Sequence, residues 1–222
     1  MIPASSHVLA VVAHADDETL GPGGTLAHFA SAGCRVVVAI AADCRTVRSR
    51  GATPGLLPEA LVAAEALGVE PPEFLGFPAM TLDRDPDELR LVRAIEGLLE
   101  RERPAVVLTH FAWDVNSDHR AVSRAVAVAC RPIGPFAPRT VLAFETPSST
   151  EWGLAPFVPT MFYDIETTLD AKLDALACYA SELRPFPHPR SAEALRARAA
   201  FWGQTAGLQY AEPFILLRHV ER

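Results

Sequence analysis

Short apolar runs alternate with helical patterns along the first two-thirds of the chain. Residues 8–13 and 35–42 are continuous runs rich in valine and alanine, which is typical of strands buried on both faces of a sheet. Between them, residues 25–32 have a helical pattern that ends at Gly33, a residue suited to a helix C-terminus. Strand, helix and strand in this order predict a βαβ unit with parallel strands.

The same alternation continues to the end of the chain. We expect further helices at 57–67, 86–103, 118–130, 168–179 and 191–202, and further strands at 73–75, 105–109, 140–144 and 214–218. Residues 146–160 are predicted to form a long loop, and 184–190 a proline-rich turn. No repeat or linker interrupts the pattern. The prediction is one α/β domain over residues 1–222, Rossmann-like, with a mostly parallel sheet flanked by helices and an active site at the carboxyl ends of the strands.

The first candidate for chemistry follows the first predicted strand directly. His14, Asp16, Asp17 and Glu18 place four ionisable side chains within five residues. Adjacent carboxylates repel one another, and a divalent cation removes that repulsion. Imidazole with carboxylate suits zinc or a similar first-row metal. An ordinary solvated acidic turn is the alternative, which the setting between a buried strand and a glycine-rich turn disfavours.

A third protein ligand is needed, because catalytic zinc usually has three and one open position. His119 is the main candidate. It is expected in the first turn of the helix that follows the strand at 105–109 and its loop, with Asp118 at or beside the N-cap of that helix. His110, at the end of that strand, competes for the metal. The remaining histidines lie at weaker positions: before the first strand, inside a helix, in the proline-rich turn and near the C-terminus.

The glycine-rich turn that follows offers a different interpretation. Gly21, Gly23 and Gly24 after a strand suggest a dinucleotide-binding loop, and Asp43 stands where a ribose-binding acid is expected. However, the third glycine of that fingerprint is absent, since position 26 is Leu. The acidic cluster would also repel a pyrophosphate. The glycines are therefore expected to let the chain turn sharply around the metal.

Composition and charge limit the partners and the cellular location that we expect for this protein. The 222 residues carry a net charge of −7 without a Lys/Arg-rich run, which argues against a nucleic-acid partner. The four cysteines fit no thiolate zinc site. No stretch has the roughly 20 apolar residues of a membrane span, and the first apolar run is too short for a signal peptide. We expect a cytoplasmic protein with no integral membrane segment; a homo-oligomer stays open.

Two segments resemble the signatures of the PIG-L/LmbE-like zinc N-deacetylases. AHADDETLGPGGT (residues 13–25) is similar to their first signature and DVNSDHRAV (residues 114–122) to their second, and the likeness extends to FETPSSTEW and SELRPFPHPRS. The resemblance implies that His14, Asp17 and His119 bind Zn2+ and that Asp16 is the general base. It implies an N-acetylated amino sugar or glycoconjugate as the substrate. Ala15 replaces the family's usual proline, and Asn116 stands where some members have a histidine.

This resemblance implies a metal-assisted amide hydrolysis. Zinc activates water and polarises the acetyl carbonyl, Asp16 moves the proton, and Asn116 or a backbone N–H stabilises the oxyanion. For the substrate we expect Arg48 and Arg50 to bind hydroxyls or a phosphate, Trp152 to stack on a sugar face, and His188 to line the entrance.

Three other functions stay open on the sequence alone. Two histidines and a carboxylate also describe non-haem iron oxygenases, which the parallel α/β pattern disfavours. A phosphoesterase would use the same metal ligands. A nucleotide-binding module would use the glycine-rich turn and would not need stoichiometric metal. The native metal, another divalent first-row ion included, and the identity of the acylated substrate are likewise open.

Overall fold

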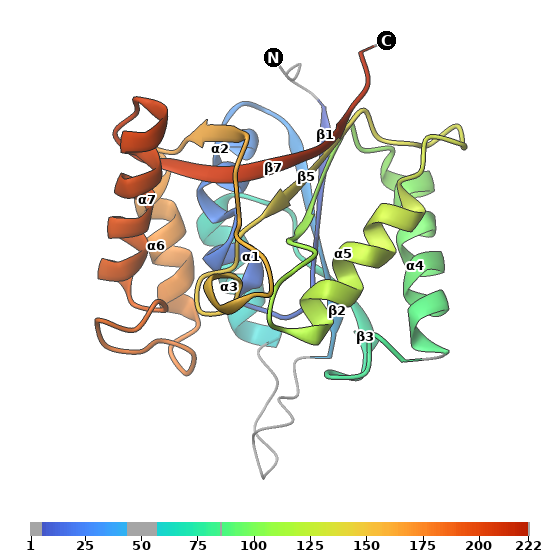
Figure 1. Cartoon of the computed structure of the whole chain (residues 1–222), viewed down its shortest axis with the longest axis horizontal. Coiled ribbons are helices and arrows are strands. Elements are labelled where there is room, and N and C mark those ends of the chain that lie inside the picture. Colours follow the sequence, from blue (N-terminus) through green and yellow to red (C-terminus); the bar gives the residue numbers. More distant parts are fainter. Residues whose placement is uncertain (1–5, 44–56, 85, 222) are drawn as a thin grey trace.

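The computed structural model describes residues 6–43, 57–84 and 86–221. Its centre is a seven-stranded sheet in the order β3-β2-β1-β4-β5-β7-β6 (Figure 1). The first five strands in this order are parallel to one another, and β7 runs antiparallel to both β5 and β6. The strands are β1 (His7–Val12), β2 (Arg35–Ala42), β3 (Glu73–Phe77), β4 (Val106–His110), β5 (Thr140–Phe144), β6 (Met161–Asp164) and β7 (Ala211–His219).

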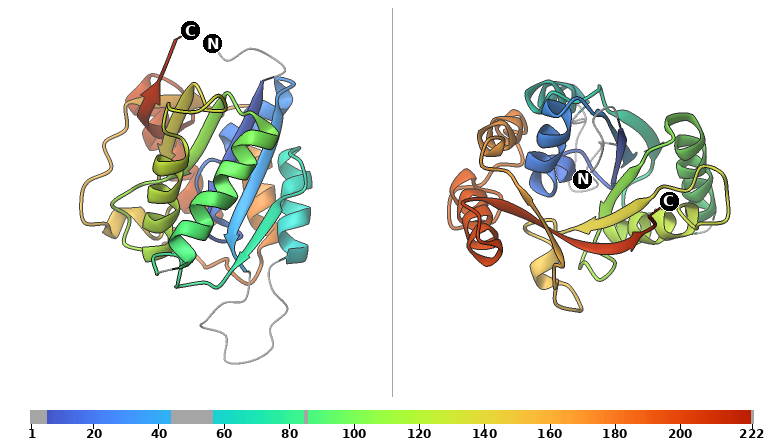
Figure 2. Two further views of the ribbon diagram at one scale, coloured as in Figure 1. Left: turned by 90° about the vertical axis from the view of Figure 1, so that its right-hand side faces the viewer. Right: turned by 90° about the horizontal axis from the view of Figure 1, so that it is seen from above.

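Helices cover both faces of the sheet, so the molecule has three layers (Figures 1 and 2). α2, α3 and α6 pack on one face, and α4 and α5 on the other. α7 lies beside α6 and contacts β7. The helices are α1 (Asp17–Leu20), α2 (Gly23–Ser31), α3 (Leu57–Leu67), α4 (Asp87–Glu102), α5 (Ser117–Ala129), α6 (Leu169–Cys178) and α7 (Ala192–Ala206), with a 3-10 turn η1 (Thr150–Trp152).

The alternation of side chains along β1 explains why its sequence is apolar at every position. Val8, Ala10 and Val12 join the core beneath α2, α3 and α6, whereas Leu9 and Val11 join the core beneath α4 and α5. Successive residues of a strand point to opposite faces, so a strand covered on both sides needs apolar residues throughout. The predicted Rossmann-like α/β fold is therefore confirmed.

The order of the strands positions the site. From β1 the chain crosses to β2 and then β3 on one side, whereas β4 leads to β5 on the other, so β1 and β4 are neighbours with opposite onward connections. The carboxyl ends of two such strands form the switch point where open α/β sheets bind ligands. His14 follows β1, and His119 follows β4.

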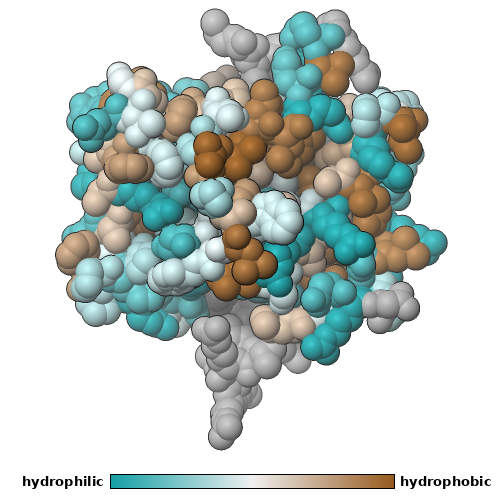
Figure 3. Space-filling model, viewed as in Figure 1, coloured by the Kyte–Doolittle hydropathy of each residue, from teal (hydrophilic) through white to brown (hydrophobic). Residues whose placement is uncertain are grey.

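The C-terminal part departs most from the sequence prediction. β6 was not predicted, and β7 spans nine residues where five were expected, because its first half pairs with β6 and its second half with β5. Apolar side chains gather on the middle of the face shown in Figure 3. On β7, Leu216 and Leu217 are exposed. Among the described helices, none has the length and apolar character needed to cross a bilayer. A cytoplasmic location stays a prediction.

Candidate metal centre

His14, Asp17 and His119 converge at the carboxyl ends of β1 and β4. One potential ligand atom from each residue lies within 4.8 Å of the other two. Asp17 Oδ2 lies 3.3 Å from His14 Nδ1 and 3.3 Å from His119 Nε2. Asp17 and His119 are buried, whereas the side chain of His14 is 27% exposed. The cluster therefore faces the outside on the side of His14.

Each of these two imidazoles is held on its far side by a carboxylate. His14 Nε2 lies 3.1 Å from Asp118 Oδ2, and His119 Nδ1 lies 3.2 Å from Asp114 Oδ1. Such a contact fixes the orientation of a ring and leaves its other nitrogen for a metal, as in carboxylate–histidine–metal arrangements. The sequence analysis assigned no such role to Asp114 or Asp118. Their only signal was the acidic composition of the loop before His119.

The buried oxygens of the cluster fit a divalent cation. Asp17 Oδ1 and Asp118 Oδ1 are buried without a hydrogen-bond partner among the described residues. A buried carboxylate oxygen without a partner is costly unless a cation satisfies it. Two imidazole nitrogens and a carboxylate are a donor set that zinc and other first-row metals accept.

The electrostatics of the cluster favour positive charge at its centre. Burial lowers the pKa of His14, but hydrogen bonds to Asp118 and Asp17 outweigh it and raise that pKa to about 10. Burial likewise disfavours a charged His119, whereas Asp17 and Asp114 raise its pKa to about 9. The carboxylates around the two rings therefore stabilise a cation between them.

His110 is close to the cluster but its nitrogens are already used. Nε2 accepts the backbone N–H of Ala13 at 2.9 Å, and Nδ1 lies 3.0 Å from Thr146 Oγ1. Burial lowers the pKa of this ring to about 4, so it is neutral. Its ring stacks on that of His119 with centroids 4.0 Å apart. His110 thus supports a candidate ligand and has no free lone pair for the metal.

Asp16 is next to Asp17 in the sequence but has different surroundings. Its backbone is in the left-handed region with φ of 104°, and its side chain is buried. Oδ2 accepts a hydrogen bond from Arg190 Nη1 at 2.7 Å. Burial raises the pKa of Asp16 above its usual range, although the Arg190 guanidinium acts in the opposite direction. One carboxylate of the pair therefore faces the two histidines, and the other faces the α6–α7 connection.

Asn116 begins helix α5. Its Oδ1 accepts the backbone N–H of Asp118 at 2.9 Å, and its own N–H donates to Asp114 Oδ1 at 2.8 Å. The N-cap is therefore Asn116, and the expectation of Asp118 at or beside that position was wrong by two residues. The physical reason is that the Asn116 side chain accepts the N–H two positions ahead, so the helix starts at Ser117.

The predicted substrate-binding residues have varied positions. Trp152 lies in η1 with its side chain 58% exposed. His188 lies in the α6–α7 connection, where its Nδ1 accepts the backbone N–H of Arg190 at 3.1 Å. Arg48 and Arg50 lie outside the described residues. The structure thus offers an accessible aromatic side chain at Trp152 and a turn-stabilising role for His188.

The glycine-rich turn has no room for a pyrophosphate. The carboxylate of Glu212 on β7 accepts the backbone N–H groups of Gly24 and Thr25 at 2.9 and 2.7 Å. Lys172 Nζ donates to Glu212 Oε1 at 2.5 Å and to Gly21 O at 2.7 Å. The start of α2, where a nucleotide phosphate would bind, is thus filled by an internal ion pair. This arrangement argues against the nucleotide-binding alternative.

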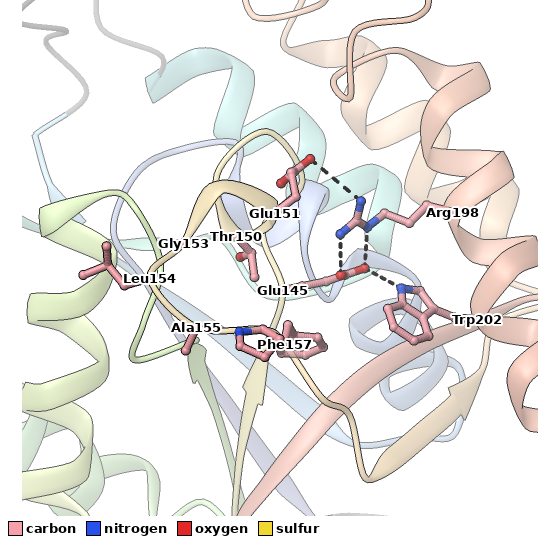
Figure 4. A pocket seen from close by; sticks show the side chains of 10 residues that line it. Glu145, Thr150, Glu151, Gly153, Leu154, Ala155, Phe157, Arg198 and Trp202 are labelled. Atoms are coloured by element: carbon pink, nitrogen blue, oxygen red, sulfur yellow. Dashed lines mark hydrogen bonds and ion pairs between the residues drawn. The ribbon is translucent and has the colours of Figure 1, made fainter.

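A cavity of about 400 Å³ lies between the loop after β5 and α7 (Figure 4). Figure 4 shows the Arg198 guanidinium directed at the carboxylate of Glu145, with two contacts of 2.6 Å, and Trp202 Nε1 donates to the same carboxylate at 2.7 Å. Thr150, which also lines the cavity, donates to Asp114 Oδ2 at 2.7 Å. One wall of the cavity is thereby linked through Asp114 to His119. Sequence reasoning did not identify this cavity, because its walls are far apart in the chain.

The fold and the cluster define a Rossmann-like α/β protein with a His/Asp/His centre at the switch point of its sheet. The model of the family "PIG-L: GlcNAc-PI de-N-acetylase" matches residues 9–130, which contain all three cluster residues. The chain therefore belongs to the PIG-L family, as the two signatures indicated.

Among similar proteins, the uncharacterized deacetylase YaiS of Escherichia coli is 32% identical over 76% of this chain and 88% of its own. The diacetylchitobiose deacetylase of Thermococcus kodakarensis is 27% identical over 92% of this chain and 80% of its own. Two relatives named as deacetylases thus align with most of the chain.

Solved structures share the whole fold. The conserved protein TT1542 from Thermus thermophilus has a TM-score of 0.78 and 29% identity, covering 98% of this chain and 97% of its own. GalB, a 4-carboxy-2-hydroxymuconate hydratase from Pseudomonas putida, has a TM-score of 0.73 and 24% identity, covering 98% and 99%. The fold alone thus hosts different reactions, and the reaction has to be argued from the site.

Proposed function

We propose that this protein is a zinc-dependent deacetylase that removes the acetyl group from the nitrogen of an N-acetylated amino sugar or glycoconjugate. The family and the deacetylase relatives support deacetylation of a sugar-like substrate. The observation that carries the proposal is the pair of adjacent carboxylates. Asp17 lies against His14 and His119, and Asp16 lies beside this cluster without belonging to it.

The residues that would hold the cation are His14 through Nδ1, His119 through Nε2 and Asp17 through its carboxylate, whose Oδ2 lies 3.3 Å from both nitrogens. A divalent cation bound there supplies Lewis acidity to a carbonyl oxygen and lowers the pKa of water. Asp118 and Asp114 hold the two imidazoles in the orientation that this binding needs. Zinc is the metal we propose, because its usual catalytic site has three nitrogen or oxygen ligands from the protein.

Asp16 is the proposed general base. It takes the proton of the attacking water and passes it to the departing amine nitrogen, so one carboxyl group serves both proton transfers. Its carboxylate accepts a hydrogen bond from Arg190, whereas the carboxylate of Asp17 lies against the two histidines. This separation gives two neighbouring carboxylates two tasks, one on the cation and one on the proton.

Asn116 is the proposed donor to the oxyanion. Its Oδ1 is occupied by the helix cap, so the amide NH2 is the end of the side chain that remains for donation. Capping also holds the amide rigidly, and a donor that needs no reorganisation is the kind that stabilises a developing charge best. For the sugar, we propose stacking on the exposed Trp152. We further propose that Arg48 and Arg50 bind hydroxyls or a phosphate and that His188 lines the entrance.

The experiment is acetate release from a panel of N-acetyl-hexosamine conjugates, with the protein stripped of metal and then loaded separately with zinc, iron or manganese. We expect acetate and free amine in equal amounts, with highest activity for zinc at one ion per chain. A panel of phosphate esters run in parallel tests the phosphoesterase alternative, and iron-dependent oxygen consumption tests the oxygenase alternative. Absence of acetate from every conjugate in every metal form would refute the proposal.

A further inference from the structure

The connection between α6 and α7 reaches back to the proposed base. Arg190 Nη1 donates to Asp16 Oδ2 at 2.7 Å and to Glu182 Oε2 at 2.8 Å, and its Nε donates to Ser148 Oγ at 2.8 Å. The Arg190 side chain is 24% exposed, so it is largely removed from water. We propose that Arg190 is a positioning residue that fixes the direction of the Asp16 carboxylate, an inference that rests on the proposed function.

Asp16 needs such a partner because its own helix does not hold its side chain. Asp16 occupies the N-cap position of α1, yet it makes no side-chain cap hydrogen bond there. Its φ of 104° lies in a region that non-glycine residues rarely adopt. A residue in such a conformation persists only where the surroundings impose it. The direction of its carboxylate is therefore set from outside the turn, and Arg190 makes the contact that sets it.

A second contact from the same segment holds the backbone of Asp16. The Asp16 N–H donates to Glu18 Oε2 at 3.1 Å, and the hydroxyl of Tyr179 donates to Glu18 Oε1 at 2.5 Å. Tyr179 is fully buried at the end of α6, eleven residues before Arg190 along the printed sequence. The α6–α7 segment thus holds the main chain of Asp16 through Glu18 and its carboxylate through Arg190.

The geometry of the guanidinium is what suits Arg190 to this task. Glu182 lies on its own segment, and Ser148 belongs to the loop after β5, so Arg190 is anchored by two elements besides Asp16. A planar guanidinium offers several donors at fixed angles, whereas a lysine ammonium is a point charge on a flexible stem. Arginine can therefore fix a direction where lysine can only supply charge.

Loss of Arg190 should therefore lower the rate of catalysis without changing metal binding. A general base has to lie about 2.6–3.2 Å from the proton that it accepts, so rotation of the Asp16 carboxylate would lower the rate. Loss of alignment can cost about 10²-fold. Within the described part of the chain, Arg190 makes no hydrogen bond or ion pair with His14, Asp17 or His119. Metal content and KM should accordingly change little.

The test compares Arg190→Gln, Arg190→Lys and the control Arg184→Gln in the zinc-loaded enzyme, with the N-acetylated conjugate that the panel shows to be turned over fastest. Arg184 lies in the same segment but donates to the backbone oxygens of Ser181 and Leu183. We expect Arg190→Gln to lower kcat about 10²-fold at nearly unchanged KM and zinc content. The melting temperature should also fall, because the buried Asp16 carboxylate loses its cation. Arg190→Lys should recover part of kcat, and Arg184→Gln should match the wild type.

A double variant separates positioning from a direct contact with substrate. If Arg190 acts through Asp16, Arg190→Gln should have no further effect on kcat in the Asp16→Asn background. An equal loss in both backgrounds, or wild-type kcat in Arg190→Gln, would overturn the proposal. If Arg190→Gln does not fold, Arg190→Lys decides: a lowered kcat at constant KM supports positioning, and wild-type kcat overturns it. A wild type that releases no acetate would instead refute the proposed function.

Discussion

Residues 7–144 supply every side chain of the His14–Asp17–His119 cluster, whereas residues 145–221 supply none of them and instead bury and orient their neighbours. We call the first region the ligand half and the second the C-terminal third. In the ligand half, chemistry comes from two short segments at adjacent strand ends. In the C-terminal third, the contacts that support these segments come from single residues in the β5–β6 loop, α6, the α6–α7 connection and β7.

The C-terminal third contacts the turn and the loop that carry the cluster through several hydrogen bonds. Arg190 pairs with Asp16, Tyr179 donates to Glu18, and Ser149 and Thr150 donate to Asp114. The comparison shows that the cluster residues and the carboxylates beside the two histidines come from one part of the chain, whereas the partners of Asp16, Glu18 and Asp114 come from another. Variants in the two regions should therefore fail in different ways.

The largest effect is expected from a change in the ligand half that removes a ligand. His119→Ala should lose stoichiometric zinc and reduce acetate release to background, because two remaining ligands bind a catalytic ion poorly. Metal analysis of the purified variant beside a steady-state assay measures both quantities. His219→Ala, on the distant β7, is the matched control and should behave as the wild type. Full zinc occupancy in His119→Ala would contradict the assigned ligand set.

The next largest effect should come from Asp16, the residue of the ligand half that Arg190 of the C-terminal third contacts. Asp16→Asn should retain zinc but lower kcat about 10²–10⁴-fold, since an amide cannot accept the proton of water. Zinc content and kcat measured on one preparation distinguish this variant from His119→Ala. A normal rate of hydrolysis in Asp16→Asn would show that the base lies elsewhere.

A smaller effect tests whether Asn116 acts on structure or on the reaction. Asn116→Asp keeps a side-chain oxygen for the helix cap but removes the N–H donor, so kcat should fall about 10²–10³-fold while the melting temperature holds. Asn116→Ala removes both functions, and should in addition lose about 1 kcal/mol of stability. Kinetics and thermal unfolding of the two variants separate the roles. Unchanged kcat in Asn116→Asp would show that Asn116 serves only as the N-cap of α5.

The smallest effect on activity is expected within the C-terminal third. Lys172→Met leaves the buried Glu212 carboxylate without its cation, which should cost about 3–5 kcal/mol in the free energy of unfolding. Urea unfolding measures this loss, and kcat per bound zinc should stay at the wild-type value. The exposed pair of Arg196 and Asp170 supplies the control, since Arg196→Gln should leave the unfolding midpoint unchanged. A fall in kcat of Lys172→Met would show that this ion pair also shapes the active site.

Much of the fold was predictable because it follows from local patterns. The continuous apolar runs of β1 and β2 indicated strands covered on both faces, and the helical periods between them indicated crossovers. The short strand β6 was missed, because four residues after a long loop, three half-buried and one exposed, give little periodic signal. The extension of β7 was missed for a related reason, since its length is set by two partners that pair with different halves of it.

The sequence by itself determined which residues are candidates for chemistry. His14, Asp16 and Asp17 follow one buried strand directly, and His119 lies in the first turn of the helix that follows another, so both segments had to lie at one edge of a parallel sheet. That argument needs only short-range patterns and the handedness of βαβ units.

Only the tertiary structure decided the surroundings of each of these residues. His110 is disfavoured as a ligand because the N–H of Ala13 occupies its Nε2, and Asp118 and Asp114 orient histidines because folding brings them to the far sides of the rings. Asp16 differs from Asp17 through its contact with Arg190, which lies 174 residues away in the chain. Periodicity reports what is near along the chain, whereas hydrogen bonds and charge depend on what is near in space, and that is settled only when the layers pack.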